Sequence, residues 1–163
     1  MKAGRKYIIL TMTILWILLI FSFSLQPGEV SGDLSSGFGR WLLQHLLPGV
    51  LEKMEAWPLE QVELWHTVLR KGAHFTEYFV LGIWMLLSAR AFRGKKRSVL
   101  WLAWVVCILV ASADETIQLF VEGRAGRVVD VFLDSAGAFC GLCACGLICH
   151  ILAHLRWRND TCH

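Results

Sequence analysis

The chain has 163 residues, of which 56% are hydrophobic and 18% are charged, and its mean hydropathy is +0.54. The length predicts a single domain, and a charged fraction below the roughly 25% of soluble proteins indicates a membrane protein. The net charge of +3 is small, and no basic stripe with interleaved aromatic residues is present, so the pattern of a nucleic-acid-binding protein is excluded.

The first element is an apolar segment at 7–25, preceded by three basic residues. It is long enough for a membrane-spanning helix. Ser22 and Ser24 have the spacing of a signal-peptide cleavage site, but the apolar run exceeds the roughly 7–15 residues of a signal-peptide core. We therefore expect an uncleaved helix, with a cleaved signal over 1–24 as the alternative.

Segment 26–70 is the one extended polar part of the chain. Apolar residues recur at helical spacing within 33–47, which predicts an amphipathic helix lying on the membrane or capping the bundle. Pro58 fits the first turn of another helix, which is expected to run toward the next apolar segment.

Three further apolar segments follow, at 72–89, 98–121 and 128–155. Each is long enough to cross a bilayer. The fold class is therefore an all-α membrane protein, a four-transmembrane-helix bundle with one or two extracytoplasmic amphipathic helices, and 1–163 is expected to form one domain.

The fourth apolar segment is rich in small residues. Gly137 and Gly141 lie four residues apart, which is typical of closely packed membrane helices. Cys140 and Cys143 form a CxxC pattern, but in this setting we expect the cysteines to pack rather than to bind metal or form a redox pair. The six cysteines do not resemble a secreted disulfide framework.

Lysine and arginine placement predicts the topology. Three lie in the N-terminal residues, five in the 90–97 loop and two in the C-terminal tail. These positions alternate correctly for one side of a four-helix protein. We therefore expect a multi-pass protein of the cell membrane with both termini in the cytoplasm, and with 26–70 and 122–127 facing outward.

Polar residues of three spanning helices are then expected at the same depth, near the outer end of the bundle. Helical spacing places them on shared faces, and charges inside spanning helices are costly enough to indicate a functional site. The helix residues are Lys71, His74, Glu77 and Tyr78, then Asp114, Glu115 and Gln118, then Asp130 and Asp134, and the adjoining 122–127 turn adds Arg124 and Arg127.

Two interpretations of this group stay open. In the first it is a working site, in which a histidine and carboxylates transfer protons or hold a divalent cation, and Arg124 binds an anion. The metal is left undetermined, as are cofactors, because no HExxH pattern is present. In the second, the charges form a salt-bridge network that holds the helices in register: Arg124 or Arg127 with Asp130, and Lys71 with Glu77 or Asp114.

Two motifs resemble the VanZ-like family of integral membrane proteins. The first is Lys71-x-x-His74-Phe75-x-Glu77-Tyr78-x-x-Leu81-Gly82, and the second is Asp114-Glu115-x-x-Gln118 followed by Arg124, Asp130 and Gly137. The resemblance covers about 71–141. Position 134 departs slightly, since the family leads us to expect Asn there as often as Asp.

The family takes its name from a member linked to resistance to the glycopeptide teicoplanin. The resemblance therefore implies a role at the outer membrane face, near lipid-linked cell-wall precursors or surface lipids. The resemblance implies no known reaction. From the polar residues themselves we expect catalytic roles for His74, Glu77, Asp114, Glu115 and Asp130, and binding roles for Lys71, Tyr78, Gln118, Arg124 and Asp134.

Three function classes follow. The first is an enzyme acting on an outer-leaflet substrate, the second a non-enzymatic binding or resistance factor, and the third a small transporter component. The expected partners are membrane lipids and a lipid-linked cell-wall precursor or glycopeptide. The sequence leaves the oligomeric state open.

Overall fold

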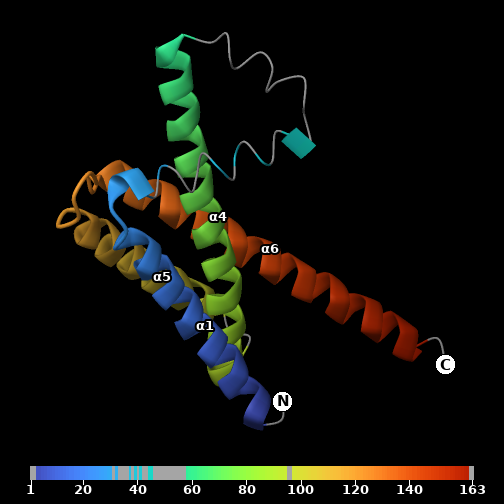
Figure 1. Ribbon diagram of the computed structural model, residues 1–163. Coiled ribbons are helices and arrows are strands. Elements are labelled where there is room, and N and C mark those ends of the chain that lie inside the picture. Colours follow the sequence, from blue (N-terminus) through green and yellow to red (C-terminus); the bar gives the residue numbers. More distant parts are fainter. Residues whose placement is uncertain are drawn as a thin grey trace.

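The structure is a computed structural model that describes residues 3–30, 32, 37, 39, 41, 44–45, 58–94 and 97–161. Its elements are four α-helices and, within these residues, no strand (Figure 1). They are α1 (Ala3–Ser24), α4 (Leu59–Arg93), α5 (Arg97–Gln118) and α6 (Val128–Thr161). Each is long and apolar enough to cross a membrane, which confirms the expected all-α membrane bundle.

Helix α4 joins two elements that the sequence suggested. The helix expected from Pro58 and the span expected at 72–89 form one helix of 35 residues. At about 1.5 Å per residue its length is about 52 Å, well above the roughly 30 Å of bilayer hydrocarbon. Its N-terminal part therefore projects past the other helices (Figure 1). The helix expected at 33–47 lies largely outside the described residues.

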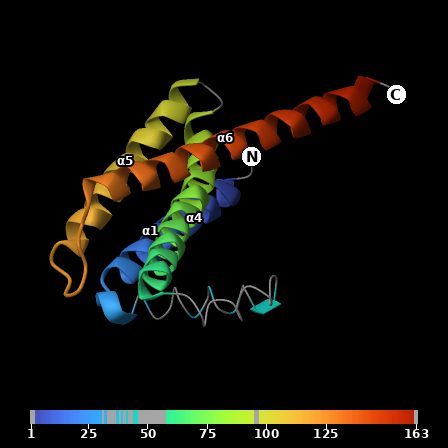
Figure 2. The same cartoon turned by 90° about the horizontal axis from the view of Figure 1, so that it is seen from above.

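The other helices differ from expectation mainly at their ends. Helix α5 stops at Gln118, three residues before the expected 121, because the chain turns there toward α6. Helix α6 continues to Thr161, beyond the expected 155. Its C-terminal half leaves the bundle in both views (Figures 1 and 2).

Helix α4 is the centre of the bundle, since it packs against α1, α5 and α6. Its crossing with α6 is a contact between backbones. A Cβ added at Gly137 would lie 2.6 Å from the Phe75 carbonyl oxygen, and one at Gly141 would overlap the Phe79 carbonyl. This confirms the close packing expected from the small residues.

The cysteines of α6 depart in part from that expectation. Cys145 is buried, whereas Cys140 and Cys143 are exposed on the outside of the bundle. Their side chains point away from the α4 contact, so the prediction that they pack between helices was wrong. Large apolar side chains are also exposed along the four helices, as expected where lipid is the solvent.

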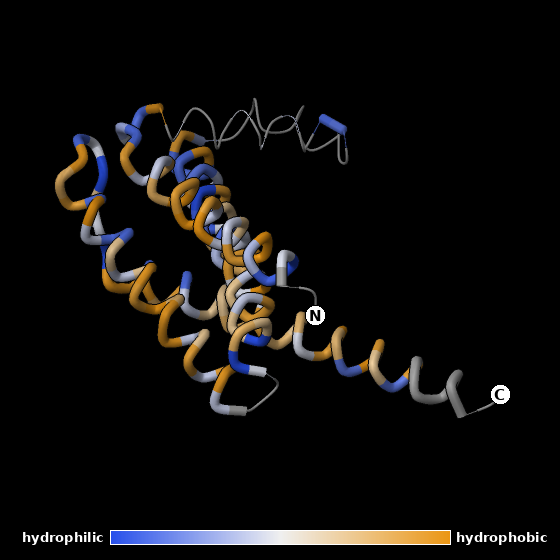
Figure 3. The backbone as a smooth tube through the Cα atoms, turned by 90° about the horizontal axis from the view of Figure 1, so that it is seen from below, coloured by the Kyte–Doolittle hydropathy of each residue, from blue (hydrophilic) through white to orange (hydrophobic). Residues whose placement is uncertain are grey.

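Polar contacts connect α1 to α4. The Trp16 indole donates a hydrogen bond to the Glu77 carbonyl oxygen at 3.0 Å, and the hydroxyls of Thr13 and Ser88 lie 2.7 Å apart. The helices are mostly apolar along their length, and hydrophilic residues gather at the turn between α5 and α6 (Figure 3). The N-terminal helix is thus packed as a member of the bundle.

Candidate functional site

The polar residues meet at one end of the bundle, where α1 ends, α5 ends and α6 begins; we call this the polar end. Helix α4 passes through it on the way to its projecting part. Several polar side chains are buried there: Ser24, Tyr78, Asp114, Glu115, Gln118 and Asp134. The structure thus brings together residues from all four helices, where the sequence predicted three.

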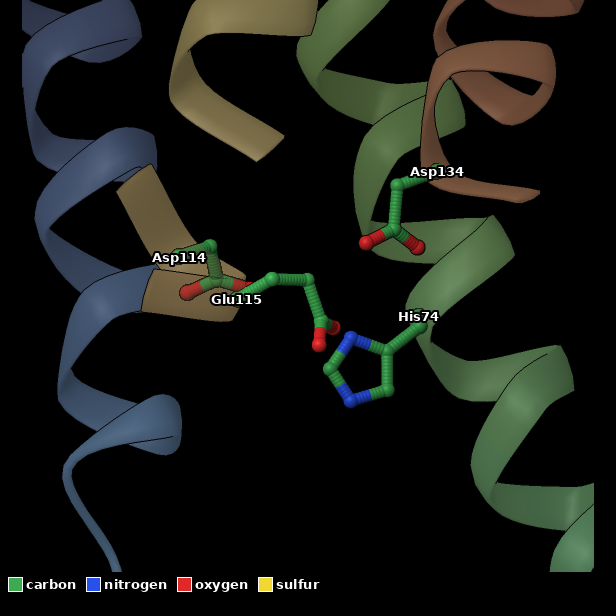
Figure 4. A group of neighbouring side chains, drawn as sticks. All are labelled: His74, Asp114, Glu115 and Asp134. Carbon is green, nitrogen blue, oxygen red and sulfur yellow. The ribbon is translucent and has the colours of Figure 1, made fainter. Parts of the chain in front are cut away.

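Four of these side chains form a compact group, which we call the carboxylate cluster: His74, Asp114, Glu115 and Asp134. One nitrogen or oxygen atom from each residue lies within 4.8 Å of the corresponding atoms of the others. Figure 4 shows the carboxylates of Glu115 and Asp134 pointing toward the space beside the His74 ring. Asp114 and Asp134 are fully buried, and Glu115 is 6% exposed.

Gln118 positions two members of the cluster. Its amide nitrogen lies 3.2 Å from the Ser24 hydroxyl, 3.4 Å from a Glu115 carboxylate oxygen and 3.5 Å from an Asp114 carboxylate oxygen. The other Glu115 oxygen accepts a 2.8 Å hydrogen bond from the Arg127 backbone N–H. Glu115 is therefore held from both sides. Ser24 was considered only as part of a cleavage site with Ser22, and its contact with Gln118 was not predicted from the sequence.

Other polar atoms of the cluster are buried without a hydrogen-bond partner among the described residues. These are both carboxylate oxygens of Asp134, one carboxylate oxygen (Oδ1) of Asp114 and the Nδ1 atom of His74. A buried polar group without a partner costs about 1–3 kcal/mol, and more when it is charged. We therefore expect these buried atoms either to bind a ligand or to be protonated.

The ion pairs differ from the network that the sequence suggested. Lys71 pairs with Asp130 at 3.2 Å, not with Glu77 or Asp114. Within the described residues, neither Arg124 nor Arg127 forms an ion pair with a carboxylate. The salt-bridge pairs predicted from the sequence are thus wrong: Lys71 pairs with Asp130, and the guanidinium of Arg124 binds backbone carbonyls instead of a carboxylate.

Arg124 is committed to backbone carbonyls. Its guanidinium donates hydrogen bonds to the carbonyl oxygens of Phe23 at 2.8 Å and Gln26 at 3.3 Å. Partial burial, together with the positive charge of Arg70, lowers the pKa of Arg124, but an arginine stays protonated at neutral pH. Arg124 therefore ties the end of α1 to the α5–α6 turn and supplies a positive charge beside the cluster.

Two residues predicted to be catalytic lie outside the carboxylate cluster. Asp130 is paired with Lys71, and Glu77 lies near enough to Asp114 to interact electrostatically but not within the group of four. Tyr78 is fully buried beside Asp114. The predicted residues thus lie together at the polar end, and the side chains of four of them are close enough to share one ligand.

Two openings adjoin the cluster. The first is a small cavity of about 20 Å³, enough for about one water molecule. Charged side chains dominate its lining, which consists of Arg70, Lys71, His74, Glu115, Gln118, Arg124, Ala125, Asp130 and Leu133.

The second opening is an apolar groove of about 530 Å³ between α5 and α6. Glu115 lines both the groove and the small cavity. The sequence did not predict the groove, since its residues have the same apolar character as lipid-facing residues elsewhere. They are Trp104, Ile108, Ser112, Glu115, Thr116, Leu119, Gly126, Arg127, Val128, Val131, Phe132 and Ser135.

Four apolar helices around a buried polar cluster define a multi-pass membrane protein. The VanZ/LLP1 family model matches residues 9–151, and the chain belongs to this family, which confirms the resemblance seen in the two motifs. No curated protein and no solved structure matches the chain.

Proposed function

We propose that this protein acts at the outer face of the cell membrane on an amphiphilic, lipid-linked substrate. The apolar chain of the substrate would lie in the groove between α5 and α6, and its anionic headgroup would lie at the polar end. The supporting observation is that Glu115 borders both the groove and the charged cavity. One molecule with an apolar tail and a charged head would place its tail in the groove and its head beside Glu115, at the border of the small cavity.

The lining of the groove favours a lipid chain. Its volume is in the range of small-molecule sites, and its lining is mostly apolar. Phe132 at its edge is 71% exposed, so the groove opens toward the surrounding lipid. Acyl and polyprenyl chains are the apolar ligands present at this depth of a bilayer.

Cations near the cluster favour an anionic headgroup. Arg127 borders the groove, and Arg70, Lys71 and Arg124 border the small cavity. Guanidinium groups bind phosphate and carboxylate through paired hydrogen bonds. A phosphate-bearing headgroup would therefore meet positive charge on one side and the carboxylates and His74 on the other.

The topology proposed from the basic residues places this end outside the cell. A role in teicoplanin resistance is part of the proposal, since the family resemblance implies action near cell-wall precursors. In an enzymatic version of this function Glu77 would transfer protons, because it lies near Asp114 but outside the carboxylate cluster. A binding factor would use the same groove and cluster without a reaction.

The test compares teicoplanin susceptibility of cells that lack the protein with cells that contain wild type or variants at matched membrane levels. Thr116→Phe fills the groove, and Asp114→Asn changes the cluster. Leu109→Phe is the matched control, because Leu109 is 64% exposed on the same helix and does not line the groove. We expect protection from wild type and Leu109→Phe, and loss of protection from the other two.

Protection by Thr116→Phe equal to that of Leu109→Phe would contradict the groove assignment. A wild-type protein that gives no protection would remove the resistance role. Glu77→Gln separates the enzyme from the binding factor. Loss of protection with wild-type amounts of co-purified lipid, measured by mass spectrometry, indicates chemistry, whereas loss of both indicates binding.

A further inference from the structure

We propose that the carboxylate cluster binds one divalent transition-metal ion. The ligands are His74 of α4, Asp114 and Glu115 of α5, and Asp134 of α6. The site would join three helices at the polar end.

The geometry of the four side chains suits a metal ion. Ligand atoms bound at about 2.0–2.3 Å lie no more than about 4.6 Å apart across the ion, and the four candidate atoms lie within 4.8 Å of one another. Movement of each ligand atom by less than about 1 Å would bring all four to bonding distance of one ion. Figure 4 shows the carboxylates of Glu115 and Asp134 close to the His74 ring, with Asp114 on the other side of the Glu115 side chain.

The charge balance of the cluster also favours a cation. Three buried carboxylates share this space, and the nearby lysine is paired with Asp130 instead. Arg124 supplies one positive charge, but its hydrogen bonds go to the carbonyls of Phe23 and Gln26. A dication together with Arg124 would balance the three negative charges.

The independent observation comes from unpartnered atoms. Asp134 is fully buried, and neither of its carboxylate oxygens has a hydrogen-bond partner within the described part of the chain; the same holds for His74 Nδ1. These atoms face the centre of the cluster (Figure 4). A metal ion would satisfy atoms of both residues at once.

The surroundings resemble the support that metal ligands usually have. Side chains and backbone groups that orient ligands raise metal affinity. Gln118 lies beside the carboxylates of Asp114 and Glu115, and the Arg127 backbone N–H holds the second oxygen of Glu115. Each of these carboxylates keeps lone pairs for an ion.

The donor set indicates the class of metal. Mg²⁺ and Ca²⁺ prefer oxygen ligands alone, whereas an imidazole with carboxylates suits Mn²⁺, Fe²⁺ or Zn²⁺. The small cavity of about 20 Å³ borders His74 and Glu115. It has room for one water or one substrate oxygen, so the ion would keep an open coordination position.

The test uses full-length protein purified in detergent and stripped with a chelator. Mn²⁺ is added, and free Mn²⁺ is measured by electron paramagnetic resonance. We expect about one bound ion per chain, and affinity weakened more than about tenfold in Asp134→Asn and His74→Gln. Glu122→Gln is the matched control, because Glu122 is an exposed carboxylate in the adjoining turn, and it should bind as wild type does.

Wild-type protein that binds no Mn²⁺ at millimolar concentration, or variants that bind as tightly as wild type, would overturn the proposal and favour protonated carboxylates. If the variants do not fold, pulsed electron paramagnetic resonance of Mn²⁺ bound to wild type decides. We expect a coupling between the Mn²⁺ electron spin and an imidazole nitrogen of His74, and absence of this coupling would show that the ion binds elsewhere. The measurement needs no lipid, so it stands or falls separately from the proposed function.

Discussion

The carboxylates of Asp114 on α5 and Asp134 on α6 share one interior space. Both side chains are fully buried, and they offer oxygen atoms within 4.8 Å of each other. Two unit charges at this separation repel by about 3 kcal/mol at an effective dielectric constant of about 20. The folded protein tolerates the pair because a cation between the two carboxylates, or a proton on one of them, reduces this repulsion.

Replacing Asp134 with asparagine tests this repulsion. In chelated protein we expect Asp134→Asn to raise the free energy of unfolding by about 1–3 kcal/mol, because one like charge is removed at nearly constant shape. With saturating Mn²⁺ we expect wild type to be more stable than Asp134→Asn, since wild type gains the free energy of metal binding. Thermal unfolding in detergent measures both. A less stable variant in chelator would show that Asp134 is compensated without metal.

The contact between α4 and α6 predicts a large effect at one glycine. Gly141→Ala places a methyl group against the Phe79 carbonyl, and we expect a loss of about 3 kcal/mol in unfolding free energy. Gly146→Ala is the matched control on the same helix, because the nearest atom to its added Cβ is Arg90 Nη2 at 3.7 Å. It should unfold at or above the wild-type temperature. Equal melting temperatures of the two variants would contradict the packing.

The ion pair between Lys71 and Asp130 lends itself to a double-mutant cycle. The side chains are 37% and 17% exposed and 3.2 Å apart, so the coupling should be about 1 kcal/mol. Lys71→Met alone should destabilise more than Lys71→Met combined with Asp130→Asn, because the single change leaves a half-buried carboxylate unpaired. Chemical unfolding of the four proteins gives the coupling, and a value near zero would count against the pair.

The hydrogen bonds from Arg124 to the carbonyls of Phe23 and Gln26 predict that a change at Arg124 loosens the end of α1 locally. Arg124→Lys keeps the charge but loses the fork that reaches Phe23 and Gln26, at a cost of about 1–2 kcal/mol. Hydrogen exchange should quicken at Gly28, whose N–H donates to the Glu122 carbonyl. Arg127→Lys is the control, because Arg127 contacts the cluster through its backbone. Unchanged exchange at Gly28 in Arg124→Lys would show that the hydrogen bonds of Arg124 do not hold the end of α1 to the α5–α6 turn.

The sequence predicted the helices and their shared polar end because both depend on local pattern. Uninterrupted apolar segments define spanning helices, and the spacing of His74, Asp114 and Asp134 places them at matching depths. Helix α4 was harder to delimit. The helix expected from Pro58 was expected to run toward the span at 72–89, and the structure shows that the two form one continuous α4.

Pairings between helices were not predictable in the same way. Lys71 was expected beside Glu77 or Asp114, yet it pairs with Asp130. The choice depends on how far α4 and α6 are rotated about their axes, and no local pattern fixes that rotation. Ser24 and the groove between α5 and α6 were missed for the same reason, since each arises only when separate helices come together.

The crossing of α4 and α6 has a consequence for the dimensions of the carboxylate cluster. Gly137 lies against the Phe75 carbonyl. Phe75 is the residue after His74 on α4, and Gly137 lies about one helical turn after Asp134 on α6. The distance between the side chains of His74 and Asp134 is therefore set by main chain touching main chain. The lipid-facing surface can change with the thickness and composition of different membranes, while the interior keeps its dimensions.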